Sequence, residues 1–152
     1  MLDRKAFTRA ELDDARAAVE ARLAAWRGLL MAVAGGPDDS DLGSAVATLE
    51  AVVFNDALVV LDRPFVGRPR AVMGTGTDPL TEVELLVDGL TLGGGVLRSS
   101  AVITWQPERS VLGLRVGDPI RLTGDAYERL ARAFLTELEH RFLRMVGDPP
   151  QE

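Results

Sequence analysis

The stretch FNDALVVLDRPF, residues 54–65, decides the fold because it is an apolar helical run that also carries polar side chains. From Ala51 to Leu61 nearly every face of this helix is apolar, which is typical of a helix buried at the centre of a domain. Asn55 and Asp62 lie two turns apart on one helix face. A buried amide or carboxylate is costly without a partner, so we expect both to have hydrogen-bond partners or a function.

Outward from this stretch, apolar residues recur with helical spacing and predict a mainly α fold. The predicted architecture is a four-helix bundle-like core with helices at about 9–34, 41–63, 79–92 and 124–146. Between the last two helices the helical period is lost. There the sequence predicts a small antiparallel β insert, at about 101–106 and 119–122. The chain is expected to form one domain over residues 1–152, with a frayed tail at 148–152.

Helix start signals support these boundaries. Thr8 and Glu11 have the spacing of a capping box, in which hydroxyl and carboxylate bond reciprocally to backbone amides. Asp78 followed by Pro79 is a strong start signal for the third helix. Caps for the second and fourth helices are predicted at Ser40 or Asp41 and at Thr123. Pro64 is expected to end the second helix, and a loop follows from Pro64 to Thr77.

Composition excludes several classes of function. The net charge of −6 disfavours binding to nucleic acid or to an anionic membrane. The chain has no cysteine, which excludes thiol catalysis, thiolate metal sites and disulfides. No signal peptide pattern and no uninterrupted apolar run of about 18 residues is present, so we expect no membrane contact and a cytoplasmic location. The bias toward arginine, alanine, glycine and valine resembles that of a GC-rich bacterial genome.

The sequence predicts no catalytic residue, metal site or cofactor. Glu137 and His140 have the Glu-x-x-His spacing of di-iron bundles, but a second such motif is missing. On a helical projection His140, the single histidine, lies on the solvent face. A solvated helix face is therefore the favoured interpretation of this pair.

Two interpretations remain open for the polar residues of the central helix and the loop after it. In the first, Asp62 pairs with Arg68 or Arg70 and orients the loop, while Asn55 bonds to loop backbone. In the second, these side chains form a pocket for a small anionic ligand. The candidate ligand-binding residues are Asn55, Asp62, Arg68, Arg70 and Glu82.

A glycine-bearing loop precedes the third helix. Helix N-termini attract anions through free amides and the helix dipole, so the loop is a candidate anion site made of Gly74, Thr75, Gly76 and Thr77. It matches neither a P-loop nor a dinucleotide fingerprint, and a loop capped by Asp78 is the favoured interpretation. Glu84 and Asp88, on one face of the same helix, are expected to form a solvated acidic surface.

The stretch from Phe54 to Phe142 resembles a family of bacterial proteins that is frequent in actinobacteria. The resemblance is carried by LDR and FV at 61–66, by Arg68, and by SVLGL, VGD and IRLT between 110 and 123. No activity is established for that family, so the resemblance implies shape more than function. The family pattern has histidine, lysine and serine where this chain has Gly67, Thr75 and Gly89, and these departures argue against an enzyme.

Together these observations favour a non-catalytic cytoplasmic helical module. We expect it to self-associate as a homodimer or other homo-oligomer and to bind a protein partner. A large exposed apolar patch, continuous across the central helix, would favour this function. The alternative is a protein that binds an anionic metabolite, or a weak enzyme, with a site between Asn55 and Asp62 and the 74–78 loop. A concave pocket where those residues converge would favour it.

Overall fold

The computed structural model describes residues 6–143, and the mainly helical architecture is confirmed. In chain order the elements are α1 (Arg9–Ala34), α2 (Ser40–Asp62), the 3₁₀ turn η1 (Arg63–Phe65), α3 (Arg70–Met73), α4 (Pro79–Thr91), the 3₁₀ turn η2 (Pro107–Arg109) and α5 (Gly124–Phe142).

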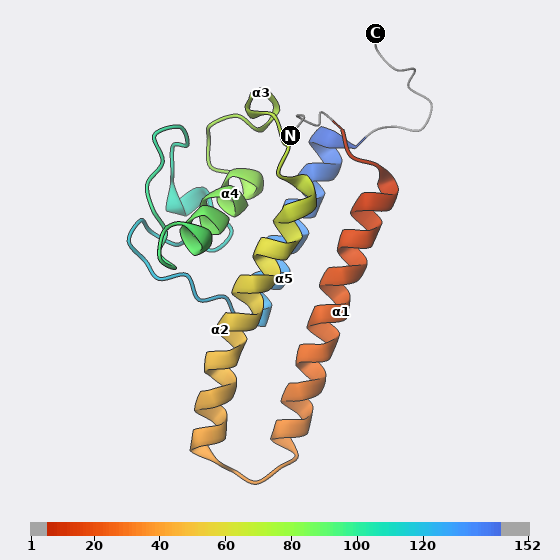
Figure 1. Cartoon of the computed structure of the whole chain (residues 1–152), viewed down its shortest axis with the longest axis vertical. Coiled ribbons are helices and arrows are strands. Elements are labelled where there is room, and N and C mark those ends of the chain that lie inside the picture. The colour runs from red at the N-terminus through yellow and green to blue at the C-terminus, as the bar shows by residue number, and fades with distance from the viewer. Residues whose placement is uncertain (1–5, 144–152) are drawn as a thin grey trace.

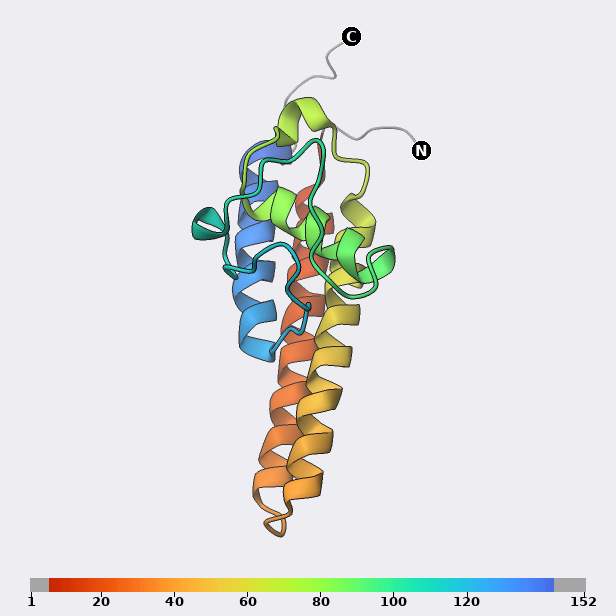
Figure 2. The ribbon, with the colours of Figure 1, turned by 90° about the vertical axis from the view of Figure 1, so that its left-hand side faces the viewer.

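α1 and α2 form a long antiparallel hairpin, and α5 lies alongside both (Figure 1). α4 crosses over α2 and α5 on the side away from α1, and the irregular segment 92–123 wraps around it (Figure 2). The closed end of the hairpin projects well beyond the N-terminal end of α5. Half of the hairpin is thus embedded in the domain, and the other half extends from it.

The local start signals are confirmed, with one exception. Thr8 and Glu11 form the predicted capping box, in which the Thr8 amide donates to the Glu11 carboxylate at 2.8 Å. Asp78 and Thr123 cap α4 and α5 as predicted. The prediction of Ser40 or Asp41 as the cap of α2 is wrong. Asp39 is the extended residue whose carboxylate accepts from two amides of the first turn.

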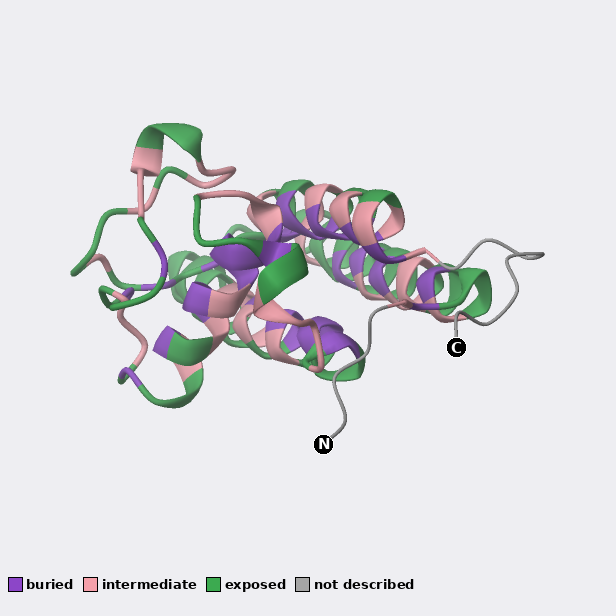
Figure 3. Ribbon diagram, turned by 90° about the horizontal axis from the view of Figure 1, so that it is seen from above, coloured by how far each residue is buried: buried purple, intermediate pink, exposed green. Residues whose placement is uncertain are grey.

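The core forms where the apolar stripes of α1, α2, α4 and α5 meet. Viewed from above, buried residues follow the inward sides of the helices (Figure 3). Aromatic rings connect the layers. Phe7 packs edge-on against Phe65 with centroids 4.9 Å apart, Phe65 lies 6.0 Å from Phe134, and Phe54 lies 5.2 Å from Tyr127. All five of these rings are fully buried.

The predicted β insert is wrong, because residues 6–143 contain two isolated bridges and no strand. The backbone of each predicted strand bonds to other groups. Thr104 donates its N–H to the Thr75 carbonyl at 2.8 Å, and the Leu122 N–H donates to the Asn55 side chain at 3.1 Å. Side chains and loop backbone, rather than a partner strand, satisfy these segments.

Two element ends and one predicted loop differ from the prediction. α2 ends at Asp62, and Pro64 sits inside η1 rather than directly ending the helix. The predicted loop contains the short helix α3. α5 ends at Phe142, not near residue 146, because Leu143 is extended and forms a parallel bridge with Phe7. The predicted frayed tail, 148–152, lies outside the described residues.

Gly89 is a point of close packing between α4 and the segment after it. A Cβ at this position would lie 2.6 Å from the Val96 carbonyl oxygen and 2.8 Å from Ile120 Cδ1. In the interior of a helix, alanine stabilises the folded state by about 1 kcal/mol relative to glycine because of its higher helix propensity. Overpacking against backbone exceeds this gain, so we expect Gly89→Ala to lower the free energy of unfolding by about 1–2 kcal/mol in urea denaturation.

Gly43→Ala is the matched control. Gly43 is exposed in α2, and a Cβ there would meet nothing within 4 Å. This variant should gain about 0.5–1 kcal/mol when measured at the same protein concentration. Equal effects of the two substitutions would show that the close approach at Gly89 does not control stability.

Candidate functional site

Asp62 and Arg68 form a buried ion pair at the end of α2. The Asp62 carboxylate and the Arg68 guanidinium are 2.7 Å apart, with side chains 8% and 4% exposed. The same guanidinium donates to the Phe65 carbonyl at 2.9 Å and lies over the Phe134 ring, 5.1 Å from its centroid. The pair closes the turn after α2 and is sealed by an aromatic ring of α5.

Asn55 lies on the same face of α2 as Asp62, two turns earlier, and bonds to a different segment of the chain. Its amide donates to the Ile120 carbonyl at 2.8 Å and accepts from the Leu122 N–H at 3.1 Å. The side chain therefore acts as a backbone mimic for the extended segment 120–122. Both the NH₂ group and the carbonyl oxygen of the amide are therefore used to hold this backbone.

Glu82 is buried and also binds backbone. Its two carboxylate oxygens accept from the N–H groups of Val111 and Leu112, at 2.5 Å and 3.2 Å. Burial raises the pKa of Glu82, and the two N–H groups oppose that rise. Glu82 thus anchors the 107–114 segment to α4 and does not face the Asp62–Arg68 pair.

The remaining predicted ligand residues, Asp62, Arg68 and Arg70, do meet in one cavity of about 210 Å³. Glu84 and Asp88 of α4 also line it, and Arg70 is ion-paired with Glu84. Burial and the neighbouring carboxylates of Glu84 and Asp62 raise the pKa of Asp88. Within residues 6–143, Arg68 Nε and one Glu84 oxygen are buried and have no hydrogen-bond partner. The cavity is therefore polar, compact and incompletely satisfied.

The predicted anion loop is occupied by internal bonds. Thr77 Oγ1 donates to the Thr104 carbonyl and accepts from the Gln106 N–H, both at 2.8 Å. The Asp78 carboxylate accepts from the first amides of α4 and is itself ion-paired with Arg141 at 3.2 Å. The amides that would hold an anion are thus filled by the chain's own carboxylate.

Glu137 and His140 do not point at a common site. Glu137 is ion-paired with Arg141 at 3.0 Å, and His140 is exposed. Groups of three or more side chains suited to hold a metal ion are absent from residues 6–143.

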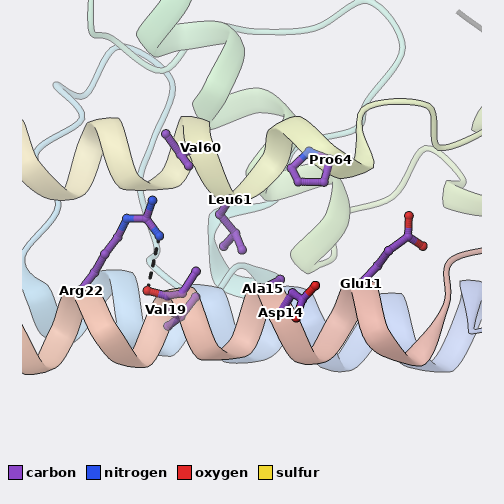
Figure 4. Close-up of a pocket in the computed structure, with 9 residues that line it drawn as sticks. Glu11, Asp14, Ala15, Val19, Arg22, Val60, Leu61 and Pro64 are labelled. Atoms are coloured by element: carbon purple, nitrogen blue, oxygen red, sulfur yellow. Dashed lines mark hydrogen bonds between the residues drawn. The ribbon is translucent and has the colours of Figure 1, made fainter.

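An apolar groove between α1 and α2 was not identified from the sequence. It consists of two hollows, of about 290 and 370 Å³, that share Arg22 and Val60 and so run on from one another. Figure 4 shows the first hollow, with α1 and α2 as its two walls and their side chains facing one another across it. Small and aliphatic residues line the groove: Ala15, Ala18, Val19, Ala25, Leu29, Leu49, Val53, Ala57, Val60 and Leu61. We call this surface the α1–α2 groove.

The projecting end of the hairpin is apolar as well. Its large exposed side chains are Leu29, Leu30, Met31, Leu42, Leu49 and Val52. Among residues 6–143, the stretch Ser40–Phe65 alone is long and apolar enough to cross a membrane, and only 22% of its most apolar part is buried. This finding qualifies the expectation from the sequence, which counted only uninterrupted apolar residues. A core helix of a soluble protein passes the same test, and residues 54–62 of α2 have that role here.

The groove has a signal in the sequence that could have revealed it. The residues of α1 that line the groove recur at alternating steps of four and three, which is a second periodicity beside the core stripe of the same helix.

Comparisons of the chain with family models, curated proteins and solved structures find no match. The groove and the polar cavity are the two features of the molecule that bear on its function.

The Asp62–Arg68 pair generates a stability prediction. Asp62→Ala leaves a buried guanidinium without its counter-charge, and we expect a loss of about 3–5 kcal/mol in the free energy of unfolding. The control is Glu20→Ala, which breaks the exposed pair between Glu20 and Arg132 and should cost less than about 1 kcal/mol. Urea denaturation followed by circular dichroism measures both. A loss below 1 kcal/mol for Asp62→Ala would contradict the architectural role of the pair.

Glu82 generates a pH prediction. Because its pKa is raised in the folded state, the folded protein holds this proton more tightly than the unfolded chain. Stability contributed by Glu82 is thus greatest below its ordinary pKa of 4.5 and falls as pH rises through the folded value. We expect the free energy of unfolding of the natural protein, minus that of Glu82→Gln, to decrease between pH 4.5 and neutrality. A difference that increases over this range would refute the assignment.

Proposed function

We propose that this protein is a non-catalytic helical module that self-associates through the α1–α2 groove and the projecting end of the hairpin. In this proposal α1, α2, α4 and α5 serve as one four-helix bundle-like core that presents the hairpin. A cytoplasmic location and a further protein partner belong to the same proposal. The continuous apolar groove is the observation that carries it.

Large apolar side chains in the groove are left in contact with water. Burial of one large aliphatic side chain contributes about 1.5–3 kcal/mol, and Leu29, Leu49 and Val60 all line the groove while more than a third exposed. A covering surface would gain from each of them, so the exposed groove favours association.

The polar residues of the core also support a non-catalytic role. Asn55, Glu82 and Thr77 each use their side chains to hold backbone of the segment 92–123. Side chains committed in this way have an architectural role that needs no ligand. The polar cavity at Asp62, Arg68 and Arg70 supports the alternative of a small-ligand site, through its unpartnered Arg68 Nε and Glu84 oxygen. It contains three of the five residues on which that alternative was based, so we rank it second.

Size-exclusion chromatography with light scattering tests self-association. We expect the natural protein to be a dimer or higher oligomer at high micromolar concentration. Leu49→Arg places a charge in the groove, where desolvation opposes association, and should give a monomer.

Leu92→Arg is the control, because Leu92 is 88% exposed and follows α4, outside the hairpin. This variant should keep the natural oligomeric state. A natural protein that is monomeric throughout the concentration range would contradict the proposed function.

A further inference from the structure

Two opposite charges lie in the α1–α2 groove without being paired to each other. Arg22 of α1 and Asp56 of α2 line the same hollow. Within residues 6–143, the side chain of Arg22 bonds only to the Ala18 carbonyl of its own helix, at 3.3 Å, and Asp56 forms no ion pair or hydrogen bond with another side chain. By contrast, Arg16 and Arg27 of α1 are each ion-paired with a glutamate of α5.

The groove walls have the spacing of helices that receive a partner helix. On α1 the lining residues Glu11, Ala15, Ala18, Arg22, Ala25 and Leu29 alternate steps of four and three. On α2, Leu49, Val53, Asp56 and Val60 follow the same rule. This is the spacing of the a and d positions of a coiled coil, whose side chains face a neighbouring helix. The α2 seam is apolar apart from Asp56, and the α1 seam carries Arg22 near its middle and Glu11 at its start. A charged or polar residue inside such a seam can fix register and oligomeric state.

The dimensions of the face suit a dimer. From Glu11 to Ala34, α1 extends about 35 Å at 1.5 Å per residue, and two helices side by side are about 20 Å wide. The resulting footprint is about 700 Å² per copy, close to the roughly 800 Å² per partner of a stable interface.

Two-fold symmetry then determines how the charges meet. In a symmetric dimer the same patch is used by both copies. A two-fold axis parallel to the helices stacks the grooves with α1 of each copy over α2 of the other, whereas an axis across the helices would stack α1 on α1. Since Arg22 and Asp56 line one hollow on opposite walls, a two-fold axis between them brings each arginine to the aspartate of the second copy.

We infer that the occupant of the α1–α2 groove is a second copy of this chain, held in register by two symmetric ion pairs between Arg22 of each copy and Asp56 of the other. The inference rests on the proposed self-association and specifies its surface and its register. The apolar seam supplies the binding free energy. The ion pairs supply specificity, because a buried pair contributes little net stability but a mismatched one is costly.

A charge-reversal cycle tests this interface. Arg22→Asp and Asp56→Arg each place like charges in contact across the dimer. We expect either to raise the dissociation constant by about 100-fold or more, as measured by sedimentation equilibrium. The double variant restores opposite charges and the natural net charge, and should recover dimerisation to within about tenfold of the natural protein.

Arg132→Asp is the matched control, since Arg132 lies on α5 in an exposed ion pair with Glu20, outside the groove. It should leave the dissociation constant unchanged. Circular dichroism of each variant checks that the helical fold is intact.

The outcomes separate this inference from the proposed function. A natural protein that is monomeric overturns both, and if that monomer co-sediments with vesicles of phosphatidylcholine, the groove belongs to a membrane surface. A natural dimer that neither single reversal weakens overturns the charge register and leaves self-association standing. A dimer weakened by both single reversals and not restored by the double variant also overturns the pairing.

Discussion

The buried pair between Asp62 and Arg68 fixes the geometry on which the upper half of the molecule depends. It ends α2, shapes the η1 turn through the Phe65 carbonyl, and sets the guanidinium against Phe134 of α5. The chain that leaves this turn forms α3 and then enters α4, which packs across α2 and α5. The turn after α2 and its contact with α5 thus depend on one ion pair that is almost fully buried. Such a pair adds less to stability than its short distance suggests, but breaking it is costly, so it specifies a single arrangement.

The second organising feature is the way the segment 92–123 is held without a sheet. Its backbone is satisfied by side chains projecting from helices and from the loop before α4: Asn55, Thr77 and Glu82. Each substitutes for a hydrogen bond that a neighbouring strand would otherwise supply. This explains why polar residues occur on helices that are otherwise apolar. They resemble a catalytic set in the sequence because buried architectural bonds and active sites require the same residue types.

How far the sequence predicts the structure depends on the range of the interactions. The Thr8–Glu11 box and the Asp78–Pro79 start are local, and the structure confirms them. The β insert is wrong because Val102–Trp105 has strand-like composition but no partner strand, and only the tertiary contact of Thr104 with Thr75 decides its conformation. A pairing of Asp62 with Arg68 or Arg70 is one of the two interpretations that the sequence leaves open, and in the structure the partner is Arg68. The meeting of Arg70 with Glu84 and Asp88 depends on how α4 crosses α2, which periodicity does not encode. The groove was overlooked because α1 carries two overlapping periodicities, and the stripe that faces the core is the stronger.

The projecting hairpin has a consequence for how the molecule comes apart. The helical residues 28–34 and 40–50 bury almost no side chain, so their order depends mainly on helix propensity and little on the core. We therefore expect this end to open while the rest of the domain stays folded, with an opening free energy lower than that of global unfolding. Substitutions of the exposed residues in this end of the hairpin should therefore change the stability of the folded core little. Natural selection can vary the sequence of this arm for what it contacts, while the core, which tolerates little change, stays as it is.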